Sequence, residues 1–254
     1  MNGLLQDKVV LITGAASGIG LATAFAAAKE GASVALCDRD SKTGDEALRL
    51  LLHHSPHAIF VPMDVTVEVE VAAGVKACVD RFGRLDGAFN NAGVSADERG
   101  VAMRKTADLS VEQWRRVMSV NLEGVWQCMR YELRHMAGAA GSIINNASVA
   151  GLVGLRGQAA YTASKHGVIG LTRTAAAEYA GDGIRVNAVC PGFVRTPLTA
   201  PFFDEGRAKV LGAVPQRRLG TPEEIADVVV WLLSDRSSYV TGTAIAADGG
   251  YTSI

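Results

Sequence analysis

The sequence predicts an α/β protein in which helices cover both faces of a parallel β-sheet. Short apolar runs alternate with longer alanine-rich stretches along its 254 residues, as in repeated β-α-β units. These runs are continuously apolar, so we expect each strand to be buried on both sides. Because parallel crossovers are right-handed, the seven expected strands should form a doubly wound, Rossmann-like sheet.

The first three strands open the chain, and each is rich in aliphatic residues and followed by a stretch with helical character. They are Lys8–Thr13 before a helix at Gly18–Lys29, Ala32–Cys37 before the helix "SKTGDEALRLLLHH", and Ala58–Pro62 before a helix at Val65–Phe82.

Four further strands complete the expected sheet. They are Leu85–Asn90 before a long loop and a helix around Val111–Met136, Gly141–Ala147 before a helix around Ala159–Tyr179, Ile184–Cys190 before a second long loop and a helix at Pro222–Ser234, and Thr243–Ala247 at the end. No linker, repeat or low-complexity segment interrupts this pattern, so residues 1–254 are predicted to form a single domain.

Two loops, Val94–Leu109 and Gly192–Thr221, are longer than is usual in a compact domain. Both follow expected strands, so both should lie at the carboxyl edge of the sheet, where folds of this type bind ligands. The charged residues of the first loop are expected to face solvent. The second loop is a candidate lid over a substrate because it carries large apolar residues, namely Leu198, Phe202, Phe203, Val210 and Leu211.

The composition argues against several classes of protein. A formal net charge of -1 gives no sign of nucleic-acid binding, and no apolar stretch is long enough for a transmembrane helix. The N-terminus lacks a signal-peptide pattern and the four cysteines form no CxxC pair, which together favour the reducing cytoplasm. His53, His54 and His57 lie close together, but no further ligand completes the set, so no metal is predicted.

A glycine-rich turn follows the first strand in the pattern Gly14-x-x-x-Gly18-x-Gly20. The next helix begins near Gly18, and the free N–H groups at its N-terminus can hold a pyrophosphate. Glycines would let this backbone approach the phosphates closely. The turn alone does not distinguish such a site from a plain corner between a strand and a helix.

Asp38 ends the second strand, where a Rossmann site places a carboxylate that binds the adenosine ribose hydroxyls. A 2′-phosphate would be repelled there, so Asp38 favours NAD over NADP. Arg39 could receive such a phosphate, but we expect its side chain to point the other way. A surface turn at Asp38 is the alternative interpretation.

Tyr161 and Lys165 lie four positions apart in an expected helix, so both side chains share one face. A nearby cation favours the phenolate and suits the tyrosine for acid/base work. Ser148 follows an expected strand and should lie at the same edge of the sheet. Its hydroxyl could hold a substrate oxygen while Tyr161 exchanges the proton.

Taken together, these motifs resemble those of the short-chain dehydrogenase/reductase family, and the likeness runs from Lys8 to Gly250. The matching elements are TGxxxGIG at Thr13–Gly20, NNAG at Asn90–Gly93, Ser148 with Tyr161-x-x-x-Lys165, PG at Pro191–Gly192, and Asn121. The resemblance implies that Tyr161 is the general acid/base and that Ser148 orients the reacting oxygen. Lys165 would bind the nicotinamide ribose and lower the pKa of Tyr161, and Asn121 would hold a water that relays protons.

The resemblance also implies a set of cofactor-binding residues. They are Gly14, Ser17, Gly18, Ile19, Gly20, Asp38, Asp64, Val65, Asn91, Ala92, Gly93, Tyr161, Lys165, Pro191, Gly192, Val194 and Thr196. In this set Asp64 and Val65 would contact the adenine, and Val194 and Thr196 would contact the nicotinamide carboxamide. Ser17 stands where many NADP-preferring relatives carry a basic residue, which again favours NAD.

The expected activity is hydride transfer between NAD and a secondary alcohol or its ketone, in a cytoplasmic enzyme that the resemblance implies is a homotetramer. Candidate substrate residues are mostly apolar, which favours an uncharged substrate; they are Val94, Val149, Ala150, Leu152, Val153, Gln158, Leu198, Phe202 and Phe203. An NADPH-dependent 3-ketoacyl reductase is the alternative enzyme. A regulatory or scaffold protein that binds NAD without chemistry is the alternative of another class, although such a protein has no need of an activated phenol.

Overall fold

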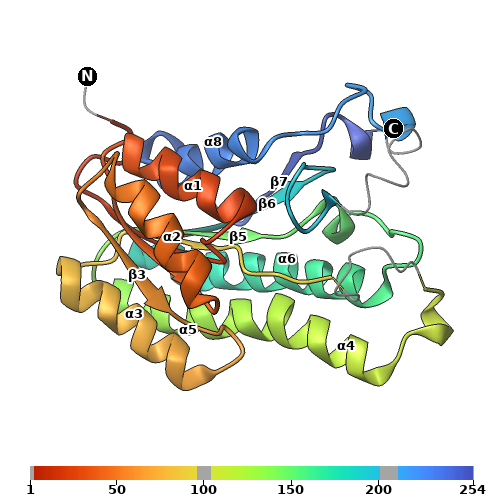
Figure 1. Ribbon diagram of the computed structural model, residues 1–254, viewed down its shortest axis with the longest axis horizontal. Coiled ribbons are helices and arrows are strands. Elements are labelled where there is room, and N and C mark those ends of the chain that lie inside the picture. Colours follow the sequence, from red (N-terminus) through yellow and green to blue (C-terminus); the bar gives the residue numbers. More distant parts are fainter. Residues whose placement is uncertain (1–2, 96–103, 201–210, 254) are drawn as a thin grey trace.

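The computed structural model describes residues 3–95, 104–200 and 211–253, and it is built around a seven-stranded parallel sheet (Figure 1). The strand order is β3-β2-β1-β4-β5-β6-β7, and every neighbouring pair is parallel. The strands are β1 Val9–Thr13, β2 Ser33–Asp38, β3 Ala58–Pro62, β4 Gly87–Asn90, β5 Gly141–Asn146, β6 Ile184–Pro191 and β7 Ala244–Ala247. The fold predicted from the sequence is therefore confirmed.

Helices cover both faces of the sheet. They are α1 Gly18–Lys29, α2 Ser41–Leu52, α3 Glu68–Phe82, α4 Val111–Met118, α5 Gly124–Met136, α6 Ala159–Tyr179 and α8 Pro222–Leu233. Helices α1, α2 and α8 pack on one face, and α3, α5 and α6 pack on the other (Figure 1). Among the residues that the structure describes, no helix is both long and apolar enough to cross a lipid bilayer.

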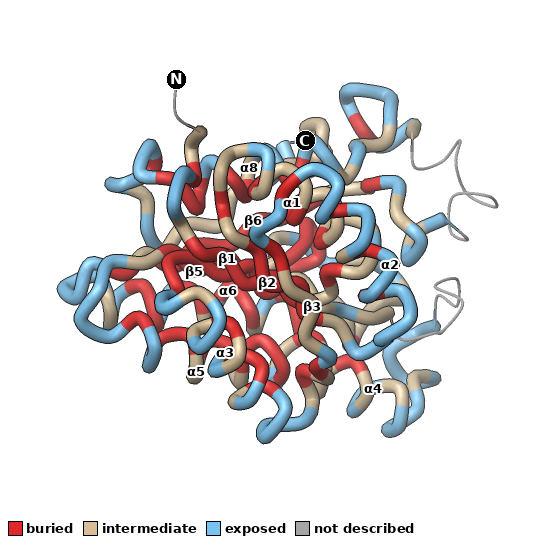
Figure 2. The backbone as a smooth tube through the Cα atoms, turned by 60° about the vertical axis from the view of Figure 1, so that its left-hand side comes forward, coloured by how far each residue is buried: buried red, intermediate tan, exposed pale blue. Residues whose placement is uncertain are grey.

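Successive residues of β1 show why the strands are apolar throughout. Val9 and Leu11 belong to the core under α3, α5 and α6, whereas Val10 and Ile12 belong to the core under α1 and α8. Side chains alternate between the two faces of a strand, and here both faces are covered. Figure 2 shows the result as a band of buried strands at the centre of the molecule.

Side chains that cap helix N-termini fix where several of the crossover helices begin. Asp40 accepts hydrogen bonds from the main-chain N–H groups of Lys42 and Thr43 at the start of α2. Thr221 and Glu224 form a reciprocal capping box at the start of α8. The helix expected from Val65 begins instead at Glu68, because Asp64 accepts from the main chain and side chain of Thr66 and holds this segment as a turn.

The long helix expected at Val111–Met136 is interrupted. A π-helical turn, η2 Ser119–Glu123, separates α4 from α5 and contains Asn121, which is fully buried. Turns of this type are often found at functional sites. The interruption therefore brings a polar side chain into the interior beside the carboxyl edge of the sheet.

The two long loops follow β4 and β6, as expected, so they begin at the carboxyl edge of the sheet. Their central parts, residues 96–103 and 201–210, lie outside the described residues, and so do the predicted substrate residues Phe202 and Phe203.

Candidate active site

The glycine-rich turn after β1 needs glycine at three places. Gly14 and Gly18 have φ of 60° and 54°, in the left-handed region that other residues rarely adopt. A Cβ on Gly20 would lie 2.2 Å from the carbonyl oxygen of Gly14. The first turn of α1 therefore packs directly against the end of β1, which leaves the main chain of this turn bare toward the space above the sheet.

Asn91, just after β4, ties the glycine-rich turn to the next strand. Its Nδ2 donates to the carbonyl oxygens of Thr13 and Gly14, both at 3.0 Å. The hydroxyl of Thr13 in turn accepts from the main-chain N–H groups of Asn91 and Ala92, also at 3.0 Å. The ends of β1 and β4 are thus held together by four hydrogen bonds.

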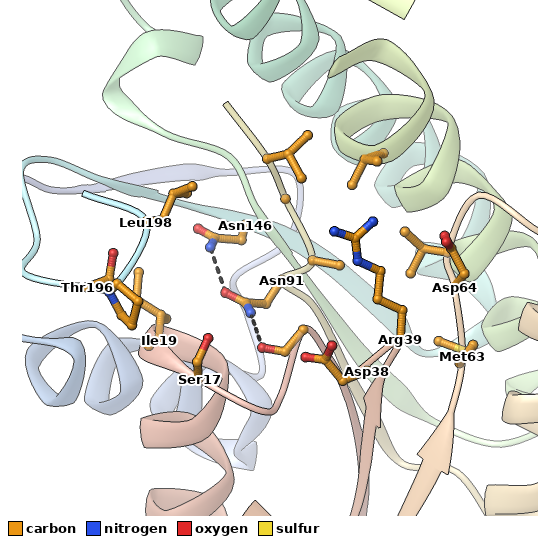
Figure 3. Close-up of a pocket in the computed structure, with 18 of the residues that line it drawn as sticks. Ser17, Ile19, Asp38, Arg39, Met63, Asp64, Asn91, Asn146, Thr196 and Leu198 are labelled. Atoms are coloured by element: carbon orange, nitrogen blue, oxygen red, sulfur yellow. Dashed lines mark hydrogen bonds between the residues drawn. The ribbon is translucent and has the colours of Figure 1, made fainter. Parts of the chain in front are cut away.

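Asp38 ends β2 with its carboxylate turned toward the glycine-rich turn. It accepts from the N–H of Ala16 at 3.1 Å and from the N–H of Asp40 at 3.2 Å. Arg39 does not point away, as expected from the sequence, but lines the same pocket, and its guanidinium reaches in between Asp38 and Asp64 (Figure 3). The expectation was wrong because Arg39 lies in a bend after the strand, where side chains no longer alternate between the faces of the sheet.

One pocket collects most of the residues that the sequence predicts for the cofactor (Figure 3). The predicted residues that line it are Gly14, Ser17, Gly18, Ile19, Asp38, Asp64, Val65, Asn91, Ala92, Gly93, Tyr161, Lys165 and Thr196, with Val94 and Leu198 from the predicted substrate set. Five lining residues were not predicted from the sequence, namely Arg39, Met63, Val120, Asn146 and Pro197.

The remaining predicted residues support the pocket or lie elsewhere. Gly20 packs on Gly14, Pro191 ends β6, Gly192 packs against Asp248, and Val194 is buried and pairs with Gly220. Val149 and Ala150 belong to the short helix η3 Val149–Gly151, while Leu152, Val153 and Gln158 lie between η3 and α6; none of these five is among the residues that line the pocket.

Tyr161 and Lys165 both reach the pocket from α6. The ammonium of Lys165 lies 5.6 Å from the centre of the Tyr161 ring and donates to the main-chain oxygen of Asn146 at 2.6 Å. Burial lowers the pKa of Lys165 to about 8. This lysine is therefore a buried ammonium that loses its proton more readily than an exposed lysine does. Such perturbed groups are common in functional sites.

The pKa of Tyr161 is shifted in the direction opposite to the one expected from the sequence. Burial raises the pKa, and a hydrogen bond with Ser148 partly opposes that effect. Loss of contact with water outweighs the other interactions of the phenol in the folded chain. Tyr161 is therefore a phenol that is protonated at neutral pH and hydrogen-bonded to Ser148.

Asn121 fixes the start of the loop after β4. Its Oδ1 accepts from the N–H of Val94 at 2.8 Å, and its Nδ2 donates to the carbonyl oxygen of Val94 at 2.9 Å. Its Nδ2 also lies 3.5 Å from the hydroxyl of Ser164 on α6. Asn121 thus joins the π turn, the loop and α6, beside Val94 and Val120, which line the pocket.

Comparison with known proteins agrees with this geometry. A family model described as enoyl-(acyl carrier protein) reductase matches residues 14–252. The solved structure of a short-chain type dehydrogenase/reductase from Mycobacterium marinum superposes with a TM-score of 0.92 at 34% identity, covering 98% of this chain and 96% of that one. The chain belongs to the short-chain dehydrogenase/reductase family.

Two relatives in this short-chain dehydrogenase/reductase family match almost end to end. The chain is 42% identical to the cyclohexanol dehydrogenase of Acinetobacter sp. (strain SE19) over 254 residues, which is 100% of this chain and 98% of that protein. It is 43% identical to the 3-oxoacyl-[acyl-carrier-protein] reductase FabG of Thermotoga maritima over 251 residues, which is 97% and 98% of the two chains. The names of these two family members indicate different substrates.

Proposed function

We propose that this protein is an NAD-dependent dehydrogenase that interconverts an uncharged cyclic secondary alcohol and its ketone. The observation that carries the proposal is the pair of half-buried Tyr161 and buried Lys165 in the pocket, with Ser148 hydrogen-bonded to the phenol. The similarity to cyclohexanol dehydrogenase supports a cyclic alcohol as the substrate class. The apolar side chains of Val94 and Leu198 in the pocket are compatible with such a ring.

The chain's own residues would orient the substrate and move the proton. The hydroxyls of Ser148 and Tyr161 would hold the reacting oxygen, and Tyr161 would take its proton in oxidation and return it in reduction. A bound nicotinamide supplies the acceptor or donor of hydride. The charge of Lys165 would stabilise the phenolate that forms in oxidation, and Asn121 would place a water for proton relay.

The pocket fits a dinucleotide in several respects. The bare main chain at Gly14 and Gly18, next to the N-terminus of α1, can approach a pyrophosphate. The carboxylate of Asp38 is fixed at the end of β2, where it can accept from ribose hydroxyls. We therefore favour NAD, with residual use of NADP through Arg39, whose guanidinium lies in the same pocket.

Replacing Asp38 with alanine is expected to lower kcat/KM for NAD by about 10- to 100-fold, because hydrogen bonds to a charged group are lost. The value for NADP should rise, since repulsion of the 2′-phosphate ends while Arg39 remains. Steady-state kinetics with both cofactors measures the change. Asp45→Ala, at an exposed position on α2, is the matched control, and a wild-type protein that prefers NADP would contradict the assignment.

A 3-ketoacyl reductase is the second candidate, and the similarity to the Thermotoga reductase favours it. We expect purified protein to form NADH from cyclohexanol and NAD, followed by absorbance, and to reduce a 3-oxoacyl thioester with NADPH far more slowly. Turnover only in the second assay would support the reductase instead. Turnover in neither assay, together with tight NAD binding, would support a regulatory or scaffold protein.

We also propose that the protein is a single domain, that it assembles as a homotetramer and that it acts in the cytoplasm. Helices α4 and α5 carry exposed apolar side chains, namely Val111, Trp114 and Trp126. A second subunit that packs on these helices would bury them. Light scattering of the purified protein tests the oligomeric state.

A further inference from the structure

Ser148 lies just past the end of β5, where its main chain has no partner in the sheet. Even-numbered residues of β5 donate toward β4, as the N–H of Ser142 does to the carbonyl oxygen of Asp86 at 3.0 Å. Because β4 ends at Asn90, the N–H of Ser148 finds no strand acceptor, and it forms no main-chain hydrogen bond with the described residues. A buried N–H group needs an acceptor, which here has to be a side chain.

Cys190 supplies this acceptor. It is the last residue but one of β6, the strand beside β5, and it is fully buried. Its sulfur accepts a hydrogen bond from the main-chain N–H of Ser148. The preceding residue, Ala147, is also tied to β6, since its N–H donates to the carbonyl oxygen of Val189 at 2.9 Å. The ends of β5 and β6 are therefore held side by side at this point.

Three hydrogen bonds then fix Ser148. Its N–H is held by Cys190, its carbonyl oxygen accepts from the N–H of Gly151 at 2.8 Å, and its hydroxyl oxygen accepts from the N–H of Ala150 at 3.1 Å. The same hydroxyl is hydrogen-bonded to Tyr161. The bonds with Gly151 and Ala150 stay within the short helix η3, so of the three only the bond with Cys190 ties Ser148 to a neighbouring strand.

A thiol suits this position because it accepts a hydrogen bond without carrying a charge. Lys165 and Arg173 on α6, together with Asp248 after β7, are charged groups near the sulfur. Burial outweighs their effects and raises the pKa of the Cys190 thiol to about 11, so the thiol is neutral at neutral pH. The charge of Lys165 therefore remains available to stabilise the phenolate of Tyr161.

We propose that Cys190 is a positioning residue whose sulfur, by accepting the main-chain N–H of Ser148, holds the serine hydroxyl where it meets Tyr161 and the reacting oxygen. The inference rests on the proposed function, because it takes Ser148 and Tyr161 to hold that oxygen. Cys190 is not among the residues that line the pocket, so it acts through Ser148. Small displacements of an orienting group are costly in catalysis, which gives this contact a measurable effect.

Three substitutions separate the acceptor from the space that the sulfur fills. Cys190→Ala and Cys190→Val both remove the acceptor, and valine also fills the space, whereas Cys190→Ser keeps an acceptor. We expect kcat for cyclohexanol oxidation to fall about 5- to 10-fold in the alanine and valine variants, as for the loss of one hydrogen bond, and to stay within about threefold of wild type in the serine variant. NADH binding, followed by fluorescence, should be unchanged. The valine variant carries the test if the alanine variant melts below the assay temperature.

A double-mutant cycle with Ser148→Ala tests whether Cys190 acts through the serine. Once the hydroxyl is absent, Cys190→Ala should lower kcat by no more than about twofold further, because the position of this main chain no longer matters. Cys128→Ala is the matched control, since it removes another buried thiol, on α5, from the same hydrophobic core. It should lower Tm and leave kcat unchanged.

Three results would overturn the inference. Wild-type kcat in both Cys190→Ala and Cys190→Val would mean that the sulfur holds nothing that the reaction needs. A serine variant as slow as the alanine variant would mean that the acceptor is not what matters. An undiminished effect of Cys190→Ala in the Ser148→Ala background would mean that Cys190 acts by another route. All three leave the proposed function standing if wild type oxidises cyclohexanol with NAD, whereas wild type that neither does so nor binds NADH refutes the proposed function and this inference with it.

Discussion

Replacing Tyr161 with phenylalanine is expected to lower kcat for cyclohexanol oxidation by about 10²- to 10⁴-fold, the usual contribution of a positioned acid or base. The ring remains in place, so its packing on α6 and its position near Lys165 should persist. NADH binding, followed by fluorescence, should therefore stay close to the wild-type value. The measurement separates loss of proton transfer from loss of cofactor binding.

Tyr179→Phe is the matched control, because Tyr179 ends the same helix and lies outside the pocket lining. It should leave both turnover and NADH binding unchanged. If Tyr161→Phe weakened NADH binding as much as turnover, Tyr161 would be a cofactor-binding residue and not the acid/base.

The pH profile gives the same test a second readout. Burial raises the pKa of Tyr161 above its ordinary value of 10.0, so the phenolate needed for oxidation is scarce at neutral pH. Oxidation by the wild type should accelerate as the pH rises from about 7 to about 10, because more of the phenol is ionised. The residual activity of Tyr161→Phe should lack this dependence.

Replacing Glu132 with glutamine is expected to remove a large pH dependence from the stability of the fold. Glu132 is fully buried on α5, and one carboxylate oxygen accepts from Asn90 at 3.0 Å. Burial raises its pKa from 4.5 to about 8, against the opposing effect of the hydrogen bond from Asn90. The folded chain therefore holds a proton on Glu132 that an unfolded chain has already released at neutral pH.

The direction in which the free energy of unfolding changes with pH follows from the number of protons that each state binds. Between pH 4.5 and about 8 the folded state binds more protons than the unfolded state, so the free energy of unfolding falls as the pH rises. The fall is at most about 1.4 kcal/mol for each pH unit. The stabilisation is complete below pH 4.5 and is lost as the pH passes through about 8.

Glu132→Gln keeps an acceptor for Asn90 but cannot ionise. Its advantage in Tm over the wild type should therefore grow from pH 5 to pH 8, by about 2–4 °C for each kcal/mol. Thermal melts across this range measure it. Glu123→Gln, at an exposed position just before α5, should follow the wild type at every pH, and identical pH slopes for wild type and Glu132→Gln would contradict burial of a protonated carboxyl.

Most elements of the fold could be predicted because parallel strands covered on both faces must be apolar throughout. The strand expected at Ala32–Cys37 is found at Ser33–Asp38, and the helix expected at Ala159–Tyr179 has those bounds. The break between α4 and α5 was not predictable in this way. The π turn Ser119–Glu123 contains neither glycine nor proline, so no residue marks the point where the helix widens.

In the candidate site, too, some residues could be placed from the sequence and others could not. Gly14, Asp38, Tyr161 and Lys165 could be placed from spacing alone, since the ends of parallel strands and one helix face bring them to a common edge. The adjacent asparagines Asn145 and Asn146, which end an apolar strand, were the only sign in the sequence of the polar contacts there. Their partners come from β4 and the residue that follows it, from α5 and from α6, which are remote in the chain.

Short-range spacing, and the rule that parallel strands end at one edge, were thus sufficient to predict the sheet and to bring the glycine-rich turn, Tyr161 and Lys165 to one pocket. Three features depended on tertiary structure: the position of Arg39 in the lining of the pocket, the raised pKa of Glu132 and the unpaired oxygen of Asn146. Each is set by which distant groups exclude water or occupy the available hydrogen bonds. Neither spacing nor composition contains that information.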